Sequence, residues 1–470
     1  MRRYTKAGWA SIGSMVFLAV LALCGAWTGT AWGEESGVKV SGEVQHDLAI
    51  SLRGDGVVAN MVSYRLSLSG ELGGAGWATP GSVYISIKGD YDLQSESGKL
   101  VDLDEAYVDL YFSGADLRLG QQAVSWGTAY GLNPTSYVNP MPNPTSSPGG
   151  AGIAGIAGAG GLELAGLPVP AVSATIYPSW GDVGLVAVLN PRLQGVPVPE
   201  DVQAGIIQEV AYEVVRQKNI PPQAVTPSAD HFSAEPPESL TDRLEYAARV
   251  GTRTGNWDLY LSGFRGWEDH PVLWVSMMPL IDSSTGYLTG VRVDPNAAYR
   301  KVTKAGFAAS CTWGPYTLWG EASYAWPDRV PELDDPNNIT FSSNEPYWQA
   351  VLGGDRTFGD AGDVYLMAEY IYYSNGSLLV PYQFVPGKSE ARHYVVGTAR
   401  WQPAQDHQLE VSGIYCMNDG SYVAMPRYTY QLSQSTSLWF GLALPGGDEE
   451  TDFGGLSDAR SATVGVKLAF

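Results

Sequence analysis

Apolar and polar residues alternate one by one along much of the chain. The last ten residues are the clearest case, because every second residue from Ala462 to Phe470 is apolar and those between are polar or small. A period of two over ten residues is typical of a strand in a transmembrane barrel, apolar toward lipid and polar toward the interior. The closing Phe470 also resembles the terminal signal that the barrel-assembly machinery reads in bacterial outer-membrane barrels. We therefore expect this machinery and outer-membrane lipid as partners.

The same alternation predicts an all-β, transmembrane antiparallel barrel of about 18 strands, with 16 as the alternative count. The strands are expected at residues 38–52, 62–72, 82–93, 102–112, from 116 onward, 172–177, 183–189, 245–253, 257–267, 302–313, 316–326, 347–358, 363–373, 391–401, 408–416, 422–431, 436–444 and 461–470. An even number would place both ends of the barrel domain on the periplasmic side. A soluble sandwich or a solenoid is the alternative, but neither requires aromatic residues at strand ends.

The connections between these strands alternate in length. Short links of turn-forming composition, with Gly, Pro, Asn, Asp or Ser, occur at 113–114, 181–182, 254–256, 314–315, 359–362, 403–406 and 433–435. Long links occur at 125–170, 190–244, 268–301, 327–346, 374–390 and 445–459, whereas 417–421 is short where a long one is expected. Short periplasmic turns and long external loops are typical of outer-membrane barrels.

Two of the long links have a character of their own. Residues 199–218 of the link 190–244 carry Val202, Ile206, Val210 and Val214 at helical spacing, which predicts a helix. It could pack on the other loops or act as a lid over the pore, and its apolar stripe favours packing. Residues 149–166 are rich in Gly and Ala; they could form a flexible loop or fold inward and plug the barrel.

The amino terminus predicts export. Arg2, Arg3 and Lys6 precede an apolar stretch, and Ala31 and Gly33 flank Trp32 as a signal peptidase would require. We expect residues 1–33 to be a cleaved signal peptide and residues 34–470 a single barrel domain in the outer membrane of a diderm bacterium.

The charge narrows the possible partners. The formal net charge is −21, and the predicted signal peptide holds three cations and no carboxylate, so the mature chain would carry −24. This argues against nucleic acid as a partner. Cys311 and Cys416 remain after cleavage; their spacing indicates neither a metal site nor a cofactor, and whether they pair is left open.

Charged residues at interior positions of the strands are candidates for lining a pore. They are Glu43, Asp47, Arg65, Lys88, Asp90, Glu105, Asp109, Arg118, Arg249, Glu321, Glu369, Arg400 and Lys467. Facing rows of opposite charge would orient polar solutes, whereas neighbouring pairs would neutralise one another. The loops add acidic residues at Glu332, Asp334, Asp335, Glu345, Asp448, Glu449, Glu450 and Asp452, which would favour cations at the mouth.

A strand from Asp116 ends abruptly in Trp, Gly and two Asn-Pro steps. Because proline has no N–H and restricts the residue before it, the ladder must end here. The stretch LRLGQQAVSWGTAYGLNPTSYVNP resembles a segment of outer-membrane porin-like proteins that include the alginate-export-like barrels and related barrels classed as a domain of unknown function. The stretch LSGFRGWEDHPV resembles another strand end of that group. The resemblance implies a channel or exporter; Gln121 stands where members commonly carry Arg.

The residues after this strand are candidates for a constriction. They are Gln121, Trp126, Tyr130, Asn133, Pro134, Asn139 and Pro140. They could instead form a rigid loop that anchors its neighbours, which is what Pro and Gly in loops usually do. In the other reading, Trp126 and Tyr130 would stack on a solute ring.

These patterns predict an outer-membrane channel, not an enzyme, for passive diffusion or export of small polar solutes, with a preference for cations. A plugged structural or adhesive barrel is one alternative, and homo-oligomers are possible. An outer-membrane hydrolase is another, but none of the five histidines, His46, His231, His270, His393 and His407, accompanies a nucleophile motif.

Overall fold

The computed structural model describes residues 37–54, 56–73, 80–130, 132–141, 166–196, 200–218, 221, 224–228, 230–359, 362–376, 378, 391–449 and 451–470. The predicted signal peptide and nearly all of the Gly-Ala stretch 149–166 lie outside these residues. In the described part of the chain, no helix is both long and apolar enough to cross a lipid bilayer.

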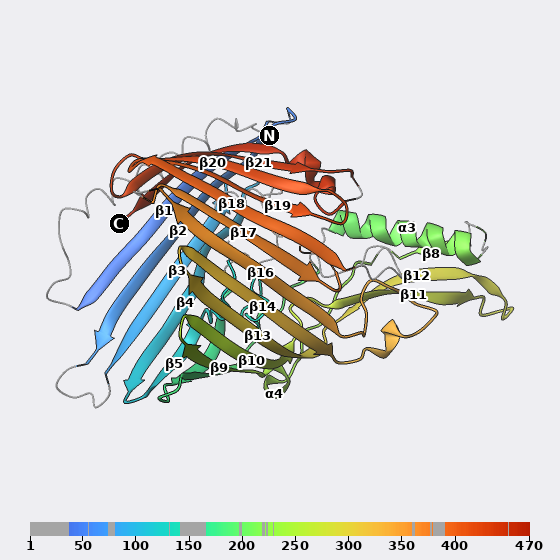
Figure 1. Cartoon of the computed structure of the whole chain (residues 1–470). Helices are drawn as coiled ribbons and strands as arrows, with labels where there is room; N and C mark the ends of the chain where they lie inside the picture. Colours follow the sequence, from blue (N-terminus) through green and yellow to red (C-terminus); the bar gives the residue numbers. More distant parts are fainter. Residues whose placement is uncertain are drawn as a thin grey trace, which may run out of the picture.

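The main body is one closed, antiparallel sheet of 18 strands, which confirms the larger of the two predicted counts (Figure 1). Each strand pairs with the next one in the ring, and β22 pairs back with β1. In order, the strands are β1 (Val38–Ser51), β2 (Val57–Leu72), β3 (Gly81–Asp92), β4 (Ser97–Phe112), β5 (Ala115–Gln122), β6 (Val169–Ile176), β7 (Asp182–Val188), β9 (Glu245–Thr254), β10 (Trp257–Trp267), β13 (Lys301–Trp313), β14 (Tyr316–Pro327), β16 (Tyr347–Phe358), β17 (Val364–Tyr373), β18 (Arg392–Ala404), β19 (His407–Cys416), β20 (Tyr422–Gln431), β21 (Thr436–Gly446) and β22 (Ser461–Ala469).

The two ends of the barrel differ as the link lengths predict. Tight turns join strands at one end, which we call the turn end; the other, the crown end, carries the long connections (Figure 1). Two further short links lie at the crown end, because β2 and β4 begin at Val57 and Ser97, five residues before the predicted starts. These longer strands leave only tight turns between β1 and β2 and between β3 and β4.

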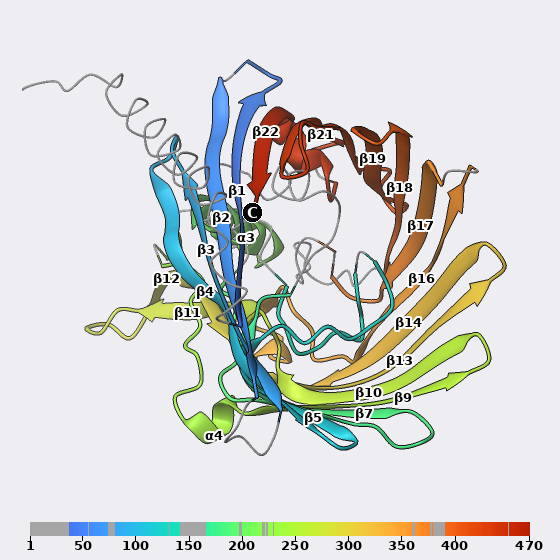
Figure 2. The same cartoon turned by 90° about the vertical axis from the view of Figure 1, so that its left-hand side faces the viewer.

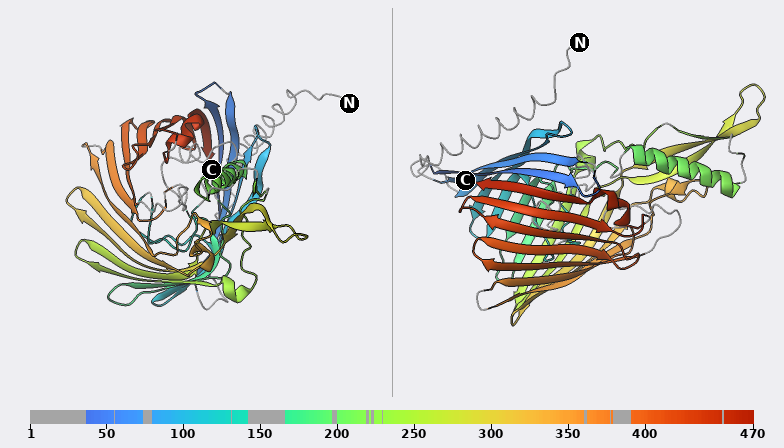
Figure 3. Two further views of the ribbon diagram at one scale, coloured as in Figure 1. Left: turned by 90° about the vertical axis from the view of Figure 1, so that its right-hand side faces the viewer. Right: turned by 90° about the horizontal axis from the view of Figure 1, so that it is seen from above.

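A small second sheet stands on the crown end; the sequence pattern predicted a long link at 268–301 but not the strands within it. That link folds into the hairpin of β11 (Val272–Ile281) and β12 (Leu288–Ala298). The short strands β15 (Ile339–Thr340) and β8 (Val225–Pro227) complete the sheet. Figure 3 shows the hairpin projecting well beyond the ring.

The predicted helix is confirmed as α3 (Glu200–Lys218). It packs on the crown sheet through Ile207, Val210 and Ala211, which share a cluster with Leu273, Val275 and other sheet residues. Of the predicted stripe, Val210 is buried in this cluster and Ile206 is partly buried against it, whereas the side chains of Val202 and Val214 lie outside the described residues. In the left view of Figure 3 the helix is seen nearly end-on, so it projects from the crown instead of lying across the mouth as a lid. The remaining short helices are α4 (Leu240–Arg243), η3 (Pro331–Leu333) and η4 (Gly454–Ala459).

The period of two divides each strand between an outer and an inner face. Large apolar side chains point outward and are exposed on the isolated chain, as at Leu261, Leu352 and Val464, whose exposed fractions are 63%, 66% and 57%. Many inner positions are buried instead, although the ring is wide. Chain inside the ring must therefore cover part of the inner wall.

Candidate functional site

Residues 123–130 and 132–141, which we call the inner segment, fold back into the ring after β5 (Figure 2). Strand β5 ends at Gln122, and five residues later Gly127 takes a φ of 101°, a value that favours glycine. A side chain at Gly127 would also meet Asn133 and Glu321, because the segment turns tightly against the wall there. The stretch that the sequence marked as an abrupt strand end thus enters the interior of the barrel.

The carboxylate of Glu321 on β14 holds the start of this segment. Its Oε1 accepts hydrogen bonds from the backbone N–H groups of Thr128 and Ala129, the latter at 2.8 Å. Its Oε2 accepts from the N–H of Thr135 at 3.2 Å and from the Thr135 hydroxyl at 2.8 Å. Glu321 is only 3% exposed. Charged acceptors form the stronger hydrogen bonds, so this one residue satisfies several buried donors of an irregular backbone.

Glu369 on β17 likewise holds the inner segment, at the next residue along the chain, Tyr130. Its Oε2 accepts from the backbone N–H of Tyr130 at 3.1 Å and from the indole N–H of Trp319 at 2.9 Å. The Tyr130 ring lies 5.2 Å from that of Trp319. The inner segment therefore hydrogen-bonds to two of the predicted wall carboxylates, Glu321 and Glu369, and covers both.

Both ends of the segment are tied to β5 and its neighbours. The Asn139 side chain accepts from the N–H of Val124 at 2.6 Å and donates to the carbonyl of Leu167 at 2.7 Å. Glu105 on β4 accepts from the N–H of Ala123 at 2.8 Å. Asn139 is thus a clamp that closes the loop on itself.

Apolar contacts hold the segment against two regions of the wall. Leu132 belongs to a buried cluster with inner residues of β14 to β21, such as Val351, Ile371 and Tyr394. Trp126, Tyr137 and Val138 belong to a second cluster built on β6 to β14. Because buried side chains pack on the segment from two regions of the wall, it is packed as closely as a protein core.

The wall formed by β22 and β1 to β4 is different, because a chain of ion pairs runs along it. Lys467 lies 2.5 Å from Glu43, and Arg65 bridges Glu43 at 3.9 Å and Asp104 at 3.1 Å. Lys88 lies 2.7 Å from the same Asp104. We call these five residues the charged wall. Asp104 was not predicted, because the pairing of β3 with β4 slips near it and breaks the period of two.

The other predicted interior charges are mostly paired with neighbours. Asp109 binds Arg118 at 2.7 Å, Arg249 binds Asp182 at 3.3 Å, and Arg400 binds Glu410 at 2.7 Å. Asp47 accepts from Gln45 at 2.6 Å. Asp90 is exposed, and the described residues offer it no ion pair. Neighbouring pairs therefore dominate over facing rows of opposite charge.

The predicted constriction residues divide into two groups. Trp126, Pro134, Asn139 and Pro140 are buried and Asn133 is partly buried, so they fit the rigid-loop reading. Tyr130 is 48% exposed and is the aromatic residue of the segment that could contact a solute. Gln121 donates to the carbonyls of Leu103 and Asp104 at 2.7 and 2.8 Å, which seals the irregular part of β4.

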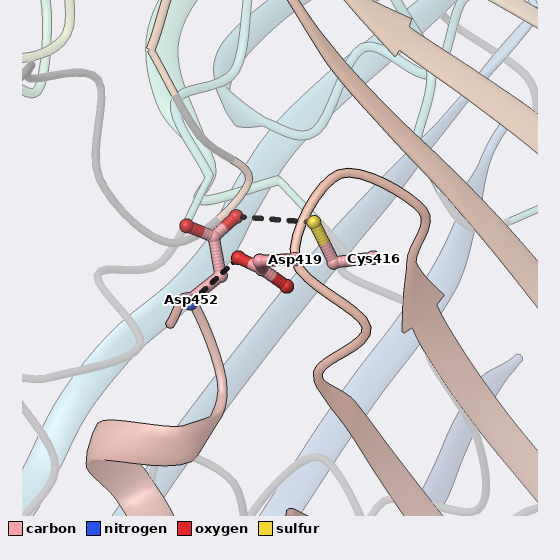
Figure 4. Close-up of side chains that lie close together, drawn as sticks. All are labelled: Cys416, Asp419 and Asp452. Carbon is pink, nitrogen blue, oxygen red and sulfur yellow. Dashed lines mark hydrogen bonds between the residues drawn. The ribbon is translucent and has the colours of Figure 1, made fainter. Parts of the chain in front are cut away.

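One further cluster joins the turn after β19 to the link before β22 (Figure 4). Cys416, Asp419 and Asp452 offer atoms within 4.8 Å of one another. Arg392 lies 3.1 Å from Asp419 and 3.6 Å from Asp452, so it already balances the carboxylates. Burial raises the pKa of Asp419, but hydrogen bonds from Ser421, from the N–H of Asp452 and from Cys416 together bring it below its ordinary value. The cluster therefore connects two links through ion pairs with Arg392. Cys416 and Cys311 are both free thiols.

Comparison with known proteins gives distant matches only. No family model matches the sequence, and no curated protein matches it significantly. Among solved structures, OmpT, an outer membrane protein of Vibrio cholerae, aligns at 10% identity over 92% of this chain and 99% of its own, with a TM-score of 0.42. An anion-selective porin from Comamonas acidovorans aligns at 12% identity over 92% and 99%, with a TM-score of 0.42. Salmonella typhi OmpF aligns at 11% identity over 92% and 97%, with a TM-score of 0.45.

Proposed function

We propose that this chain is an outer-membrane channel through which small polar solutes diffuse, inward or as export. The observation that carries the proposal is the closed ring of 18 strands, in which Glu43, Arg65 and Lys467 of the charged wall keep exposed side chains beside a packed inner segment. A closed ring leaves no strand edge unpaired, which is what a sheet needs to cross a bilayer.

The outer face supports a place in the membrane. Exposed aliphatic residues occupy the middle of the strands, and Trp257, Trp313 and Trp401 lie toward the turn end with exposed fractions of 49%, 73% and 48%. Trp326 and Trp348 lie toward the crown end and are also exposed. Two aromatic belts with an apolar band between them match the two interfaces of a bilayer. Insertion would follow from the assembly machinery acting on the last strand.

The mechanism we propose is passive diffusion past the inner segment. The segment narrows the barrel, and the charged wall offers fixed charges to the passing solute. Acidic residues of the crown loops, such as Asp334 and Asp335, add a negative field at the mouth, and this field favours cations. The cation preference therefore rests on the crown, because the charged wall itself has three cations and two carboxylates.

A plugged, non-conducting barrel is the second candidate, and one observation favours it. The inner segment packs on two regions of the wall through Leu132, Trp126, Tyr137 and Val138, as a plug would. The hydrolase alternative gains no support, because His393 and His407 bond the hydroxyls of Tyr370 and Tyr428. Export, which the resemblance of residues 117–140 to porin-like proteins implies, would use the same proposed channel.

The test is single-channel recording from the refolded protein in a planar bilayer with a salt gradient across it. Stable open steps with a reversal potential on the cation side are expected. Closed membranes in spite of confirmed insertion would favour the plugged barrel. An anion-side reversal potential would keep the channel and reject the role of the acidic crown.

A further inference from the structure

The outer face of the barrel carries a cavity of about 610 Å³, lined by residues of β6, β7, β9, β10 and β13. Its floor includes the small outward residues Ala248 and Gly263, which lie side by side on β9 and β10, and Ala174 on β6, which lies beyond Leu185 of β7. The register places these at one level, because Leu185 pairs with both Ala174 and Ala248, and Ala248 pairs with Gly263. Small residues side by side on a wall of larger ones leave a hollow.

Larger outward side chains border this hollow. Leu185 and Tyr246 are 45% and 54% exposed, so nothing in the described chain covers them. The residues next to the floor along each strand, such as Ala247 and Phe264, belong to the buried inner cluster. The cavity therefore opens to the outside of the ring and is separate from its interior.

The hollow becomes polar and cationic toward the crown end. Arg265 pairs across the sheet with Tyr246 and Thr303, and its guanidinium binds Asp328 through two contacts of 2.9 and 2.6 Å. One step further, Lys301 pairs with Trp267, and its Nζ lies 5.2 Å from the centre of the indole ring. No carboxylate of the described residues lies within 4.0 Å of Lys301 as an ion-pair partner.

We propose that this hollow is a lipid-binding site for an anionic, phosphate-bearing lipid of the outer leaflet. One acyl chain lies over Ala248 and Gly263, beside Leu185, and the phosphate lies at Lys301 beside Arg265. An apolar groove with a cation just beyond its crown-side lining, a cation that has no ion-pair partner among the described residues, is complementary to a molecule with a long apolar chain and an anionic head. The site rests on the proposed place of the barrel in the outer membrane.

A second copy of the chain fits this surface less well. In a two-fold contact the same patch occurs on both partners, so each copy would bring its own Lys301 and Arg265 to the seam. The single carboxylate Asp328 is already engaged by Arg265. The charge at the crown end of the hollow is therefore better matched by a lipid phosphate.

The experiment uses the full chain in detergent micelles, with native mass spectrometry counting bound phosphatidic acid or phosphatidylcholine. Phosphatidic acid is expected to bind about five-fold more tightly than phosphatidylcholine, as one cation near a lipid phosphate allows. Lys301→Gln should abolish this difference and Lys301→Arg should keep it. Ala248→Trp should fill the groove and weaken both lipids.

Ala399→Trp is the matched control, because Ala399 is an exposed outward alanine on β18 between Leu366 and Val411. It should bind lipid as the wild type does, and the channel conductance of all variants should match. Equal binding by wild type, Lys301→Gln and Ala248→Trp in a barrel that conducts overturns the lipid site and leaves the channel proposal intact. A barrel that enters no bilayer overturns both. If Ala248→Trp only turns an oligomer into a monomer, the hollow is a seam between copies and not a lipid site.

Discussion

Two regions of the inner wall follow the same alternation and yet have opposite chemistry. On β14 to β18 many inner positions are occupied by buried apolar residues such as Trp319, Val351, Ile371 and Tyr394. On β22 and β1 to β4 they are occupied by the charged wall, in which Arg65, Glu43 and Lys467 keep side-chain exposures of 48%, 37% and 40%. The difference follows the inner segment, which packs on the first region through Leu132.

The comparison shows that an inner face need not be polar if the chain covers it. Apolar side chains facing water inside a barrel would cost free energy, and the inner segment removes that cost by packing on them. It also brings buried backbone donors, which Glu321 and Glu369 satisfy. The part of the wall on which the inner segment does not pack carries the ion pairs of the charged wall, where a solute would meet fixed charge.

The largest effect on conduction is expected from removing the carboxylate that holds the inner segment. Glu321→Ala leaves the N–H groups of Thr128, Ala129 and Thr135 without their acceptor, at about 1–3 kcal/mol for each buried donor. The segment should detach, and single-channel conductance should rise and become noisy. The conductance of Glu321→Gln should lie between those of the wild type and Glu321→Ala, because only one side-chain oxygen remains to accept hydrogen bonds.

Glu43→Gln serves as the control for that prediction. It removes a carboxylate of the charged wall that makes no contact with the inner segment. Its conductance should stay steady. If both substitutions change the current alike, the segment is not what narrows the barrel.

A smaller effect is expected from weakening the apolar contact between the segment and its wall. Leu132→Ala should lower the free energy of unfolding by about 2–5 kcal/mol, because it opens a cavity in a buried cluster. Urea unfolding of the refolded protein in detergent measures this, and the open-channel current should become noisier. Leu352→Ala, on the outer face and 66% exposed, is the control and should change stability little. Equal losses for both would mean that the cluster around Leu132 is not packed as a core.

The sequence predicts much of this fold because a period of two is a local property. The number and order of the ring strands follow from it, and so does the helix at α3 from its period of about four. The slip near Asp104 could not be predicted, since an irregular step hides the face on which later residues lie. The hairpin of β11 and β12 was missed because its strands pack in a crown sheet and not in the ring.

The covered wall did leave a signal in the sequence. In β17, Met367, Ile371 and Tyr373 share the inner face with Glu369, and Leu366, Tyr370 and other apolar residues point outward, so both faces are largely apolar. A strand that is apolar on both faces must be buried on both. In a barrel this predicts lipid outside and protein inside. Which segment provides the cover depends on contacts far apart in the sequence, such as that between Thr135 and Glu321.

A change of selectivity with little change of conductance is expected on the charged wall. Asp104→Asn removes the shared partner of Arg65 and Lys88 and keeps the shape of the side chain. The two cations then face the solute without a carboxylate between them, so the reversal potential in a salt gradient should move toward anions. Asp328→Asn, which neutralises a carboxylate on the outer face, should leave it unchanged. A shift of the same size in both would place the selectivity in the overall field and not in the wall.

The smallest effect on conduction is expected from the crown. Ile207→Ala, in α3, removes a buried contact with the crown sheet and should loosen that sheet by about 2–5 kcal/mol. Limited proteolysis should then cut within the crown more readily. Conductance and reversal potential should stay as in the wild type, because the helix projects from the mouth and packs on β8 and β12. A closed or widened channel in this variant would mean that the crown helps hold the inner segment in place. The crown and the inner segment would then not act independently on conduction.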